Sequence, residues 1–387
     1  MKKIGFIPLR KGSKGIKGKN KRKLVGRPLY TWVLNEAILS DIDEVFVYTD
    51  NDEIIYQVNT FYQWCNKIKV LYRSDKSATD TASTESAMLE FSDIIKHNYD
   101  IIVLLQATSP LTTAHDINSC INKIANENFD SALSVVQFSR FTWSQNGESL
   151  NYNYNERPRR QDFKGNYAEN GAVYVTKKDI LLTKKNRLGG RIGISVMPED
   201  TYFEIDEKSD WIIIEKLIEN RLLKLKKPIN HIKAFVFDVD GVFTDGKVGE
   251  SSDKELFKTF SLRDGMGFEL LKQEEIIPVV ITSEDSSIVK NRMNKLKIEH
   301  VFLNIKDKFS FLDEFLIKNN LQRNQIAYIG DDINDSANLA SAGWSFCPKD
   351  AVDSVKSYSD IVLHNNGGNK AIREAIEFII KFNTKIN

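Results

Sequence analysis

Short apolar runs rich in β-branched residues alternate with longer segments of helical spacing in the first part of the chain. The expected strands are Ile4–Pro8, Glu44–Thr49, Ile68–Tyr72 and Ile101–Gln106. The expected helices between them are Pro28–Leu39, Asn51–Trp64 and Thr81–His97. Strands that alternate with helices predict parallel βαβ units in a doubly wound sheet. Such sheets bind ligands at the carboxyl ends of their strands, so polar motifs directly after strands are the candidates for function.

A second series of strands and helices follows a predicted helix that runs from Lys208 to about Leu225. Its expected strands are Ile232–Phe237, Ile277–Thr282, Ile326–Ile329 and Ile361–Leu363. A Lys-rich segment with Pro228 lies between the two series, so we expect a domain boundary near residues 226–231. The prediction is an α/β protein with two doubly wound parallel-sheet domains, over residues 1–227 and 231–387.

Composition and charge place the chain among ordinary globular proteins. Of its 387 residues, 41% are hydrophobic and 28% are charged, and the net charge is +1. This balance gives no global field toward nucleic acid or membrane, so neither is expected as a partner. The 3 cysteines are scattered, which favours a reducing compartment. The first apolar run ends at Arg10, too soon for a signal peptide, and we expect a cytoplasmic protein.

Four polar motifs follow strands of the second series in an order that suits phosphate-ester hydrolysis. They are Asp238 and Asp240 in DVDG, Thr282 in VVITSE, Lys306 and Lys308 in NIKDK, and Asp331, Asp332 and Asp335 in IGDDINDS. Asp238 could attack phosphorus, and Asp240 could donate and then accept a proton. Thr282 and a lysine could hold the phosphoryl oxygens. Asp331 could complete a magnesium site with the first two aspartates.

This set resembles the haloacid dehalogenase superfamily, in particular its small sugar-acid phosphatases such as 3-deoxy-manno-octulosonate 8-phosphate phosphatase. TDG at 244–246, RDGMG at 263–267 and HNNGGNKAIRE at 364–374 belong to the likeness. The resemblance implies Lys308 rather than Lys306 as the phosphate ligand, and Mg²⁺ as the cofactor. Relatives read ITGR where this chain has ITSE, which puts the substrate preference in doubt. The resemblance also implies a capless Rossmannoid domain, closed by a hairpin over Lys247–Thr259, and a tetramer formed through this domain.

A cationic, glycine-containing loop, from Arg10 to Lys23, follows the first strand. Its three glycines, Gly12, Gly15 and Gly18, would let the backbone approach a polyphosphate, which Arg10 and Lys14 could neutralise. No GKS or GKT ends the loop, so it is not a Walker loop. A basic nucleic-acid patch or a solvated loop remains an alternative.

Further motifs after strands extend the pattern of the first domain. They are Arg73 in VLYRS, DTAS at 80–83, LLQATSPL at 104–111, RPRRQD at 157–162, ENGAVY at 169–174 and FEIDEKSDW at 203–211. Together with the loop they resemble the CMP-sialic acid synthetases, also called N-acylneuraminate cytidylyltransferases, over about residues 1–225. That likeness implies a nucleotide-sugar-transferase-like, Rossmann-type domain, Mg²⁺ as its cofactor, and a dimer formed through this domain.

The resemblance to the synthetases carries a set of site residues. The implied nucleotide ligands are Arg10, Gly12, Ser13, Lys14, Asn20, Arg73, Ser83 and Gln106. The implied sugar ligands are Gln106, Arg159 or Arg160, Asn170 and Tyr174. The implied metal ligands are Glu204 and Asp206, of which Asp206 would be the principal one. Arg10 and Lys14 would also stabilise the charge that develops during transfer.

We interpret the chain as a bifunctional enzyme. The first domain would transfer CMP from CTP to the anomeric hydroxyl of a nonulosonic acid, and the second would hydrolyse a phosphorylated sugar-acid precursor. One alternative keeps the first activity and makes the second domain structural or oligomerising. Another is a nucleic-acid-binding protein that uses Arg10–Lys23, which the near-zero net charge and the lack of an aromatic platform disfavour.

Overall fold

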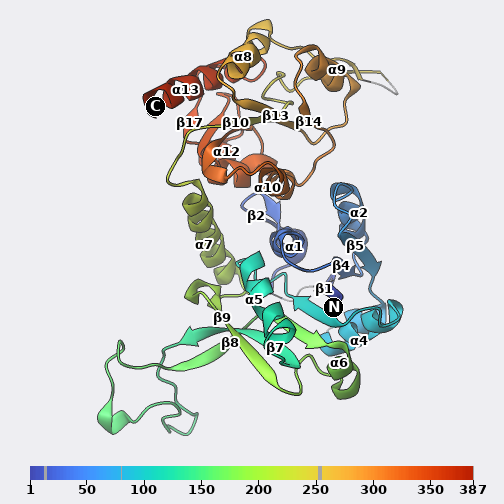
Figure 1. The fold of residues 1–387 in the computed structure, drawn as a ribbon, viewed down its shortest axis with the longest axis vertical. Helices are drawn as coiled ribbons and strands as arrows, with labels where there is room; N and C mark the ends of the chain where they lie inside the picture. The colour runs from blue at the N-terminus through green and yellow to red at the C-terminus, as the bar shows by residue number, and fades with distance from the viewer. Residues whose placement is uncertain (13–14, 80, 252–254, 387) are drawn as a thin grey trace. The chain divides into compact units, whose positions relative to one another are not determined.

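The computed structural model describes residues 1–12, 15–79, 81–251 and 255–386, and its internal contacts divide the chain into two compact units (Figure 1). The first unit comprises Met1–Leu24 and Pro28–Leu217. The second comprises Ile218–Asn387 together with the short segment Val25–Arg27. This division falls inside helix α7 (Lys208–Lys226), and the domain boundary near residues 226–231 stays a prediction.

The first unit is built on a seven-stranded sheet in the order β5-β4-β1-β6-β8-β7-β9. The strands are β1 (Lys3–Leu9), β4 (Glu44–Thr49), β5 (Ile68–Tyr72), β6 (Ile101–Leu105), β7 (Ser131–Phe138), β8 (Asn166–Lys177) and β9 (Ile192–Met197). The α/β class is confirmed, but the sheet is not wholly parallel. Strand β8 pairs antiparallel with both β6 and β7, because the chain turns back through residues 139–165 before it re-enters the sheet.

Helices cover both faces of the first sheet, and alternate residues of the interior strand β1 point to opposite sides. Ile7 of β1 belongs to one apolar cluster and Phe6 to the other. The main helices are α1 (Leu29–Leu39), α2 (Asp52–Phe61), α4 (Thr84–Ile94), α5 (Ala114–Ala125) and α6 (Lys178–Lys184). Asn51 caps α2 and Ser83 caps α4, so these polar residues fix where the helices begin.

The second unit contains a six-stranded sheet, parallel throughout, in the order β14-β13-β10-β15-β16-β17. The strands are β10 (Ala234–Phe237), β13 (Ile277–Ile281), β14 (His300–Phe302), β15 (Ile326–Ile329), β16 (Trp344–Cys347) and β17 (Ile361–Val362). The helices are α8 (Leu262–Gln273), α9 (Ser287–Lys295), α10 (Lys308–Lys318), α11 (Ser336–Ser341), α12 (Asp353–Lys356) and α13 (Ala371–Ile386). This fold agrees with the predicted class.

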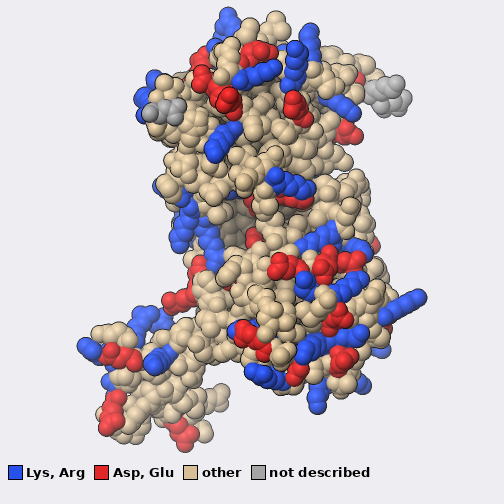
Figure 2. All heavy atoms as spheres, in the orientation of Figure 1, with Lys and Arg blue, Asp and Glu red and all other residues tan. Residues whose placement is uncertain are grey.

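The predicted hairpin is present in the second unit, where β11 (Gly249–Glu250) pairs antiparallel with β12 (Glu255–Phe257). Within the part of the chain that the structure describes, no helix is both long and apolar enough to cross a bilayer. Cationic and anionic side chains are interspersed on the face shown in Figure 2.

Candidate active sites

The carboxyl ends of three adjacent strands of the second unit carry the predicted hydrolytic residues. Asp238 follows β10, Thr282 follows β13 and Asp331 follows β15. The Asp238 backbone N–H donates to the Ile329 carbonyl (3.1 Å), which fixes the start of the Asp238 loop against β15. Asp238 and Thr282 are buried. Parallel neighbours place their strand ends at one edge of the sheet, so the three side chains share one site.

Lys308, the first residue of α10, is the buried cation of this site. Its Nζ lies 2.5 Å from Asp238 Oδ2 and 2.8 Å from Asp335 Oδ1. Burial by itself would lower the pKa of Lys308, but the two carboxylates outweigh it and the pKa is raised. Tyr328 also donates to Asp335 Oδ1 (2.7 Å), so Asp335 holds the lysine in place. Lys306, in contrast, pairs with Glu284 at 3.0 Å.

Three aspartates of the second unit are arranged as a cation site. Asp238, Asp331 and Asp335 each offer an oxygen, and these oxygens lie within 4.8 Å of one another. Burial raises the pKa of Asp238 to about 6, with Lys308 opposing the shift and Asp335 adding to it. Burial and then the charges of Asp238 and Asp335 raise the pKa of Asp331 to about 8. Asp331 Oδ1 is buried without a hydrogen-bond partner in the described structure, and such crowded oxygens fit a hard divalent cation.

The cation site explains why a glycine, Gly241, follows Asp240. Gly241 has φ +82°, and a Cβ there would lie 2.0 Å from Asp331 Oδ2. Any side chain at this position would therefore displace the Asp331 carboxylate. Asp335, which sequence reasoning named within its motif without a role, is brought into the cluster by the 3-10 turn at Ile333–Asp335.

Asp240 lies beside these aspartates but has a different partner. Its Oδ1 accepts from Lys258 Nζ at 2.7 Å and from Thr244 Oγ1 at 3.3 Å. The Lys258 side chain is only 3% exposed, and it also pairs with Glu255 of β12 at 3.3 Å. Lys258 was not predicted as a site residue, although its position in a hairpin expected to close the site could have indicated this role. Asp240, predicted as a metal ligand, is not one of the three clustered carboxylates.

The cation site predicts a pH-dependent effect of Mg²⁺ on stability. The raised pKa values mean that the metal-free folded protein binds more protons than the unfolded chain between the ordinary carboxyl pKa of 3.8 and about pH 8. Its free energy of unfolding therefore falls as the pH rises through this window. A cation that stabilises the ionised carboxylates removes this cost. In thermal melts, Mg²⁺ should raise the midpoint more at about pH 8 than at about pH 5.5.

The control for this effect is Asp331→Asn, which removes the carboxylate with the larger shift. We expect the variant to lose most of the pH dependence of the Mg²⁺ effect. An increase in midpoint that is equal at both pH values in the wild type would contradict the assignment of the cluster.

The first unit contains a cavity of about 530 Å³ at the carboxyl ends of its parallel strands. Five of the predicted ligands line it, namely Arg10, Asn20, Arg73, Gln106 and Asp206. Gly15, Lys19, Thr84, Thr108 and Glu207 are also among the lining residues. The cavity thus combines cations with carboxylates, as a site for a nucleotide and its metal requires.

The cationic loop forms one wall of this cavity and is tied to the Asp206 segment. Asn20 donates from its side chain to the Arg10 carbonyl (3.3 Å), which closes the loop on itself. Lys19 Nζ donates to the Ile205 carbonyl at 2.6 Å and lies 3.2 Å from Asp206 Oδ1. Sequence reasoning did not single out Lys19. Ser13 and Lys14, both predicted phosphate ligands, lie outside the described residues.

The backbone of Gly15 lies close to the Asp206 segment. A Cβ at Gly15 would lie 2.1 Å from the Asp206 carbonyl oxygen, so Gly15→Ala must displace one of the two backbones. Because displacement of a positioned group by about 1 Å can cost on the order of 100-fold in rate, we expect kcat/KM for CTP to fall at least about tenfold. Pyrophosphate release measures the loss, and phosphate release by the second unit serves as the internal control. Unchanged kcat/KM would show that the contact has no role in CTP use.

Arg73 is a buried cation at the cavity. Its guanidinium donates to the Ser77 carbonyl, and its Nε has no hydrogen-bond partner among the described residues. Burial lowers the pKa of Arg73 from its ordinary value. An arginine that is buried with an unused donor beside a cavity is suited to an anionic or carbonyl ligand.

Gln106 and Glu204 both approach Gly171. A Cβ at Gly171 would lie 3.1 Å from Glu204 Oε2 and 3.6 Å from Gln106 Nε2. Loss of solvent around the carboxylate, and then the charge of Asp206, raise the pKa of Glu204. A carboxylate whose ionised form is disfavoured by burial and by a neighbouring acid is again an arrangement that a cation would relieve.

The remaining predicted ligands within the described part of the chain are not among the residues that line the cavity. Asn170 is buried, where it accepts from Ser134 (2.6 Å) and donates to Thr201 (3.2 Å). The Tyr174 hydroxyl donates to Glu169, and burial followed by Glu169 raises its pKa. Two others are Gly12 and Ser83, and Ser83 caps α4. Arg159 and Arg160, in the segment 139–165, are exposed, and Arg159 pairs with Asp162 at 2.7 Å. Their ligand roles stay predictions.

Comparison with known proteins assigns the two parts of the chain to two families. Residues 4–229 match the family model of cytidylyltransferases, and residues 204–376 match that of haloacid dehalogenase-like hydrolases. The N-acylneuraminate cytidylyltransferase B of Danio rerio is 30% identical over 99% of this chain and 91% of its own length. The 3-deoxy-D-manno-octulosonate 8-phosphate phosphatase KdsC of Haemophilus influenzae is 34% identical over 41% of this chain and 87% of its own.

Among solved structures, the 3-deoxy-D-manno-octulosonate 8-phosphate phosphatase of Moraxella catarrhalis, in complex with magnesium, phosphate and KDO, is 34% identical. It covers 43% of this chain and 94% of its own, with a TM-score of 0.39. The two family matches lie on the same residues as the two candidate sites. The chain is therefore an enzyme that belongs to the cytidylyltransferase family and carries a haloacid dehalogenase-like hydrolase domain in the same polypeptide.

Proposed function

We propose that the first unit transfers CMP from CTP to the anomeric hydroxyl of a nonulosonic, sialic-type acid, and that the second hydrolyses a phosphorylated sugar-acid precursor. The name of the Danio rerio relative supports the acceptor class, because the likeness covers nearly the whole of both chains. The name of the Haemophilus influenzae relative supports a sugar-acid phosphate as the second substrate. Free acid released by the second unit would be the substrate of the first.

In the first unit, the acceptor oxygen forms a bond to the α-phosphorus of CTP while the bond to pyrophosphate breaks, and the hydroxyl proton is released to solvent. Arg10 and Lys14 would neutralise the phosphate oxygens, and Arg73 and Gln106 would contact the nucleoside. Asp206 and Glu204 would hold Mg²⁺, which supplies charge neutralisation at the phosphates when bound. The protein's own contribution is then mainly alignment of the two substrates.

In the second unit, Asp238 would attack phosphorus and form an aspartyl-phosphate as the ester oxygen leaves. Asp240 would give that oxygen a proton and then take one from the water that hydrolyses the intermediate. Lys308 and Thr282 would hold the phosphoryl oxygens. Asp238, Asp331 and Asp335 could hold Mg²⁺, which stabilises the charge of the phosphoryl group when bound.

The observation that carries the phosphatase proposal is the buried contact of Lys308 with Asp238 and Asp335 next to Asp331. A merely structural domain gains little from such a cluster, since buried charge pairs are weak contributors to stability compared with apolar packing. The cluster is explained by a reaction that needs a carboxylate nucleophile and a fixed cation.

The test is a panel of 2-keto sugar acids and their phosphate esters, each with Mg²⁺, and with CTP for the free acids. We expect pyrophosphate from CTP with at least one free acid, and inorganic phosphate from at least one ester. Absence of pyrophosphate with every acid would refute cytidylyl transfer, and absence of phosphate from every ester would refute the phosphatase. The predicted homo-oligomer, with a dimer through the first unit and a tetramer through the second, stays a proposal.

A further inference from the structure

We infer that Arg27 is a positioning residue of the second unit's phosphatase site, although it stands in the sequence beside the nucleotide loop of the first. The inference rests on the proposed phosphatase activity and adds a residue to it. Val25–Arg27 packs as part of the second unit, with Val25 and Arg27 only 2% and 3% exposed. The segment is thus buried and makes its contacts as part of that unit.

Arg27 fixes the residue that precedes the catalytic lysine. Its Nη2 donates to Asp307 Oδ2 at 2.8 Å and its Nε to Asp307 Oδ1 at 3.2 Å, a two-point contact. Asp307 in turn caps α10, because its Oδ1 accepts from the Ser310 backbone N–H (3.4 Å). Lys308 is the first residue of that helix. The orientation of the first turn of α10, and so of Lys308, therefore depends on the Arg27–Asp307 pair.

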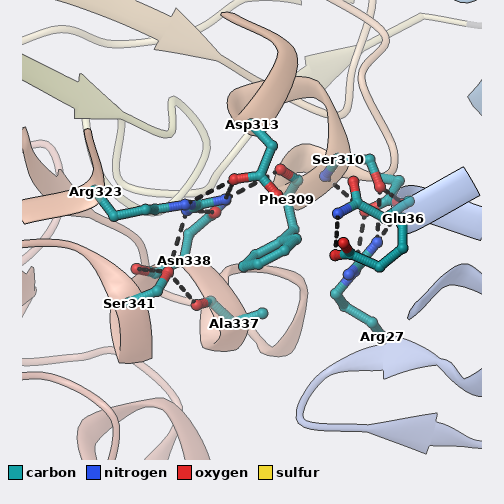
Figure 3. A network of polar contacts seen from close by, with 11 residues as sticks. Arg27, Glu36, Phe309, Ser310, Asp313, Arg323, Ala337, Asn338 and Ser341 are labelled. Carbon is teal, nitrogen blue, oxygen red and sulfur yellow. Dashed lines mark hydrogen bonds and ion pairs between the residues drawn. The ribbon is translucent and has the colours of Figure 1, made fainter. Parts of the chain in front are cut away.

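Arg323 also contacts the first turn of α10, from the side opposite Arg27. The Arg27 and Arg323 guanidinium groups lie 4.5 Å and 4.1 Å from the centre of the Phe309 ring, and Figure 3 shows them on two sides of it. Arg323 also donates to Asp313 (2.7 Å) and to the Phe309 carbonyl (3.2 Å). Phe309 follows Lys308 directly, so both neighbours of the lysine are fixed by buried arginines.

Gly26 lies against the turn that contains Asp335, the second carboxylate partner of Lys308. Gly26 has φ +77°, and a Cβ there would lie 2.2 Å from the Ile333 carbonyl oxygen and 2.9 Å from Ser336 Cβ. Ile333 opens the turn that ends in Asp335. Val25–Arg27 therefore contacts both elements that set the Lys308–Asp335 distance, and loss of the Arg27 contact should move Lys308 relative to Asp238.

The test is Arg27→Met in the full chain, assayed with p-nitrophenyl phosphate and the ester that the wild type hydrolyses fastest. We expect kcat for phosphate release to fall roughly 10- to 100-fold with little change in KM. Inhibition by orthovanadate, which mimics the transferring phosphoryl group, should weaken in parallel. Pyrophosphate release by the same preparation should stay close to the wild-type rate. Lys318→Met, which removes an exposed cation from the far end of α10, should change neither activity.

Several outcomes would overturn the inference. It falls if Arg27→Met releases phosphate at the wild-type rate, or if phosphate and pyrophosphate release decline together. A lower kcat with unchanged vanadate inhibition would also contradict it, since a loss of folded protein alone gives that result. If Arg27→Met does not fold, Arg27→Lys, which keeps the charge but not the two-point contact, must reduce kcat at least about threefold. A wild type that hydrolyses no ester would instead refute the phosphatase itself.

Discussion

Replacing Asp238 with asparagine should reduce phosphate release on the order of 10⁴-fold, because the substitution removes the atom that attacks phosphorus. Asparagine keeps the shape of the side chain and an acceptor for Lys308. The alternative substitution, Lys308→Met, would leave Asp238 and Asp335 buried without their cation, at a cost of roughly 3–5 kcal/mol in folding free energy. Asp238→Asn therefore separates chemistry from stability.

Two controls belong with this variant. Pyrophosphate release from CTP should be unchanged, since the variant residue belongs to the second unit. Asp332→Asn makes the same change of charge at an exposed neighbour, and asparagine can also cap the turn that Asp332 begins. It should leave phosphate release close to normal. If Asp238→Asn leaves every activity unchanged, the second domain is structural and the alternative interpretation is correct.

Asp206→Asn should lower cytidylyl transfer by about 100- to 1,000-fold, the range seen when one group that stabilises transition-state charge is removed. Asp206 lines the cavity beside Arg10 and Gln106, and with Glu204 it would carry the metal. Asparagine can still accept from Lys19, so the loop contact at 3.2 Å is preserved while the charge is lost.

The dependence of the rate on Mg²⁺ distinguishes a ligand from a structural residue. In Asp206→Asn, pyrophosphate release should require more Mg²⁺ for half-maximal rate, and phosphate release by the second unit should be unaffected. Glu199→Gln, the same change at an exposed acid of the preceding turn, is the matched control. An unaltered Mg²⁺ requirement in Asp206→Asn would remove this residue from the proposed metal site.

Most of the strands and helices that depend on the local hydrophobic pattern could be predicted from the sequence. Strands β4, β5 and β15 have the predicted bounds, because their apolar, β-branched runs are bounded by clear polar breaks. The hydrolytic residues could be found because parallel strands bring motifs at their ends to one edge. The antiparallel insertion of β8 was missed, since the direction of a strand within a sheet leaves no mark in its own hydrophobic pattern.

Contacts between distant segments could not be predicted in the same way. Arg27 and Asp307 are 280 positions apart, and each looks like an ordinary surface charge in isolation. Lys19, Lys258 and Asp335 likewise gain their roles only from residues that the fold brings beside them. Asn170, whose ligand role is implied by the resemblance and stays a prediction, makes buried hydrogen bonds through its amide that the sequence did not indicate.

The most direct test of two consecutive activities in one chain is a ³¹P NMR time course. The wild-type protein would be mixed with CTP, Mg²⁺ and the 9-phosphate of a nonulosonic acid. Inorganic phosphate should appear first, followed by pyrophosphate and a CMP-sugar signal. Asp238→Asn should stop all three, and added free acid should restore only pyrophosphate and the CMP-sugar. Transfer of CMP to the acid while its phosphate is still attached, or a time course that Asp238→Asn does not change, would contradict the account.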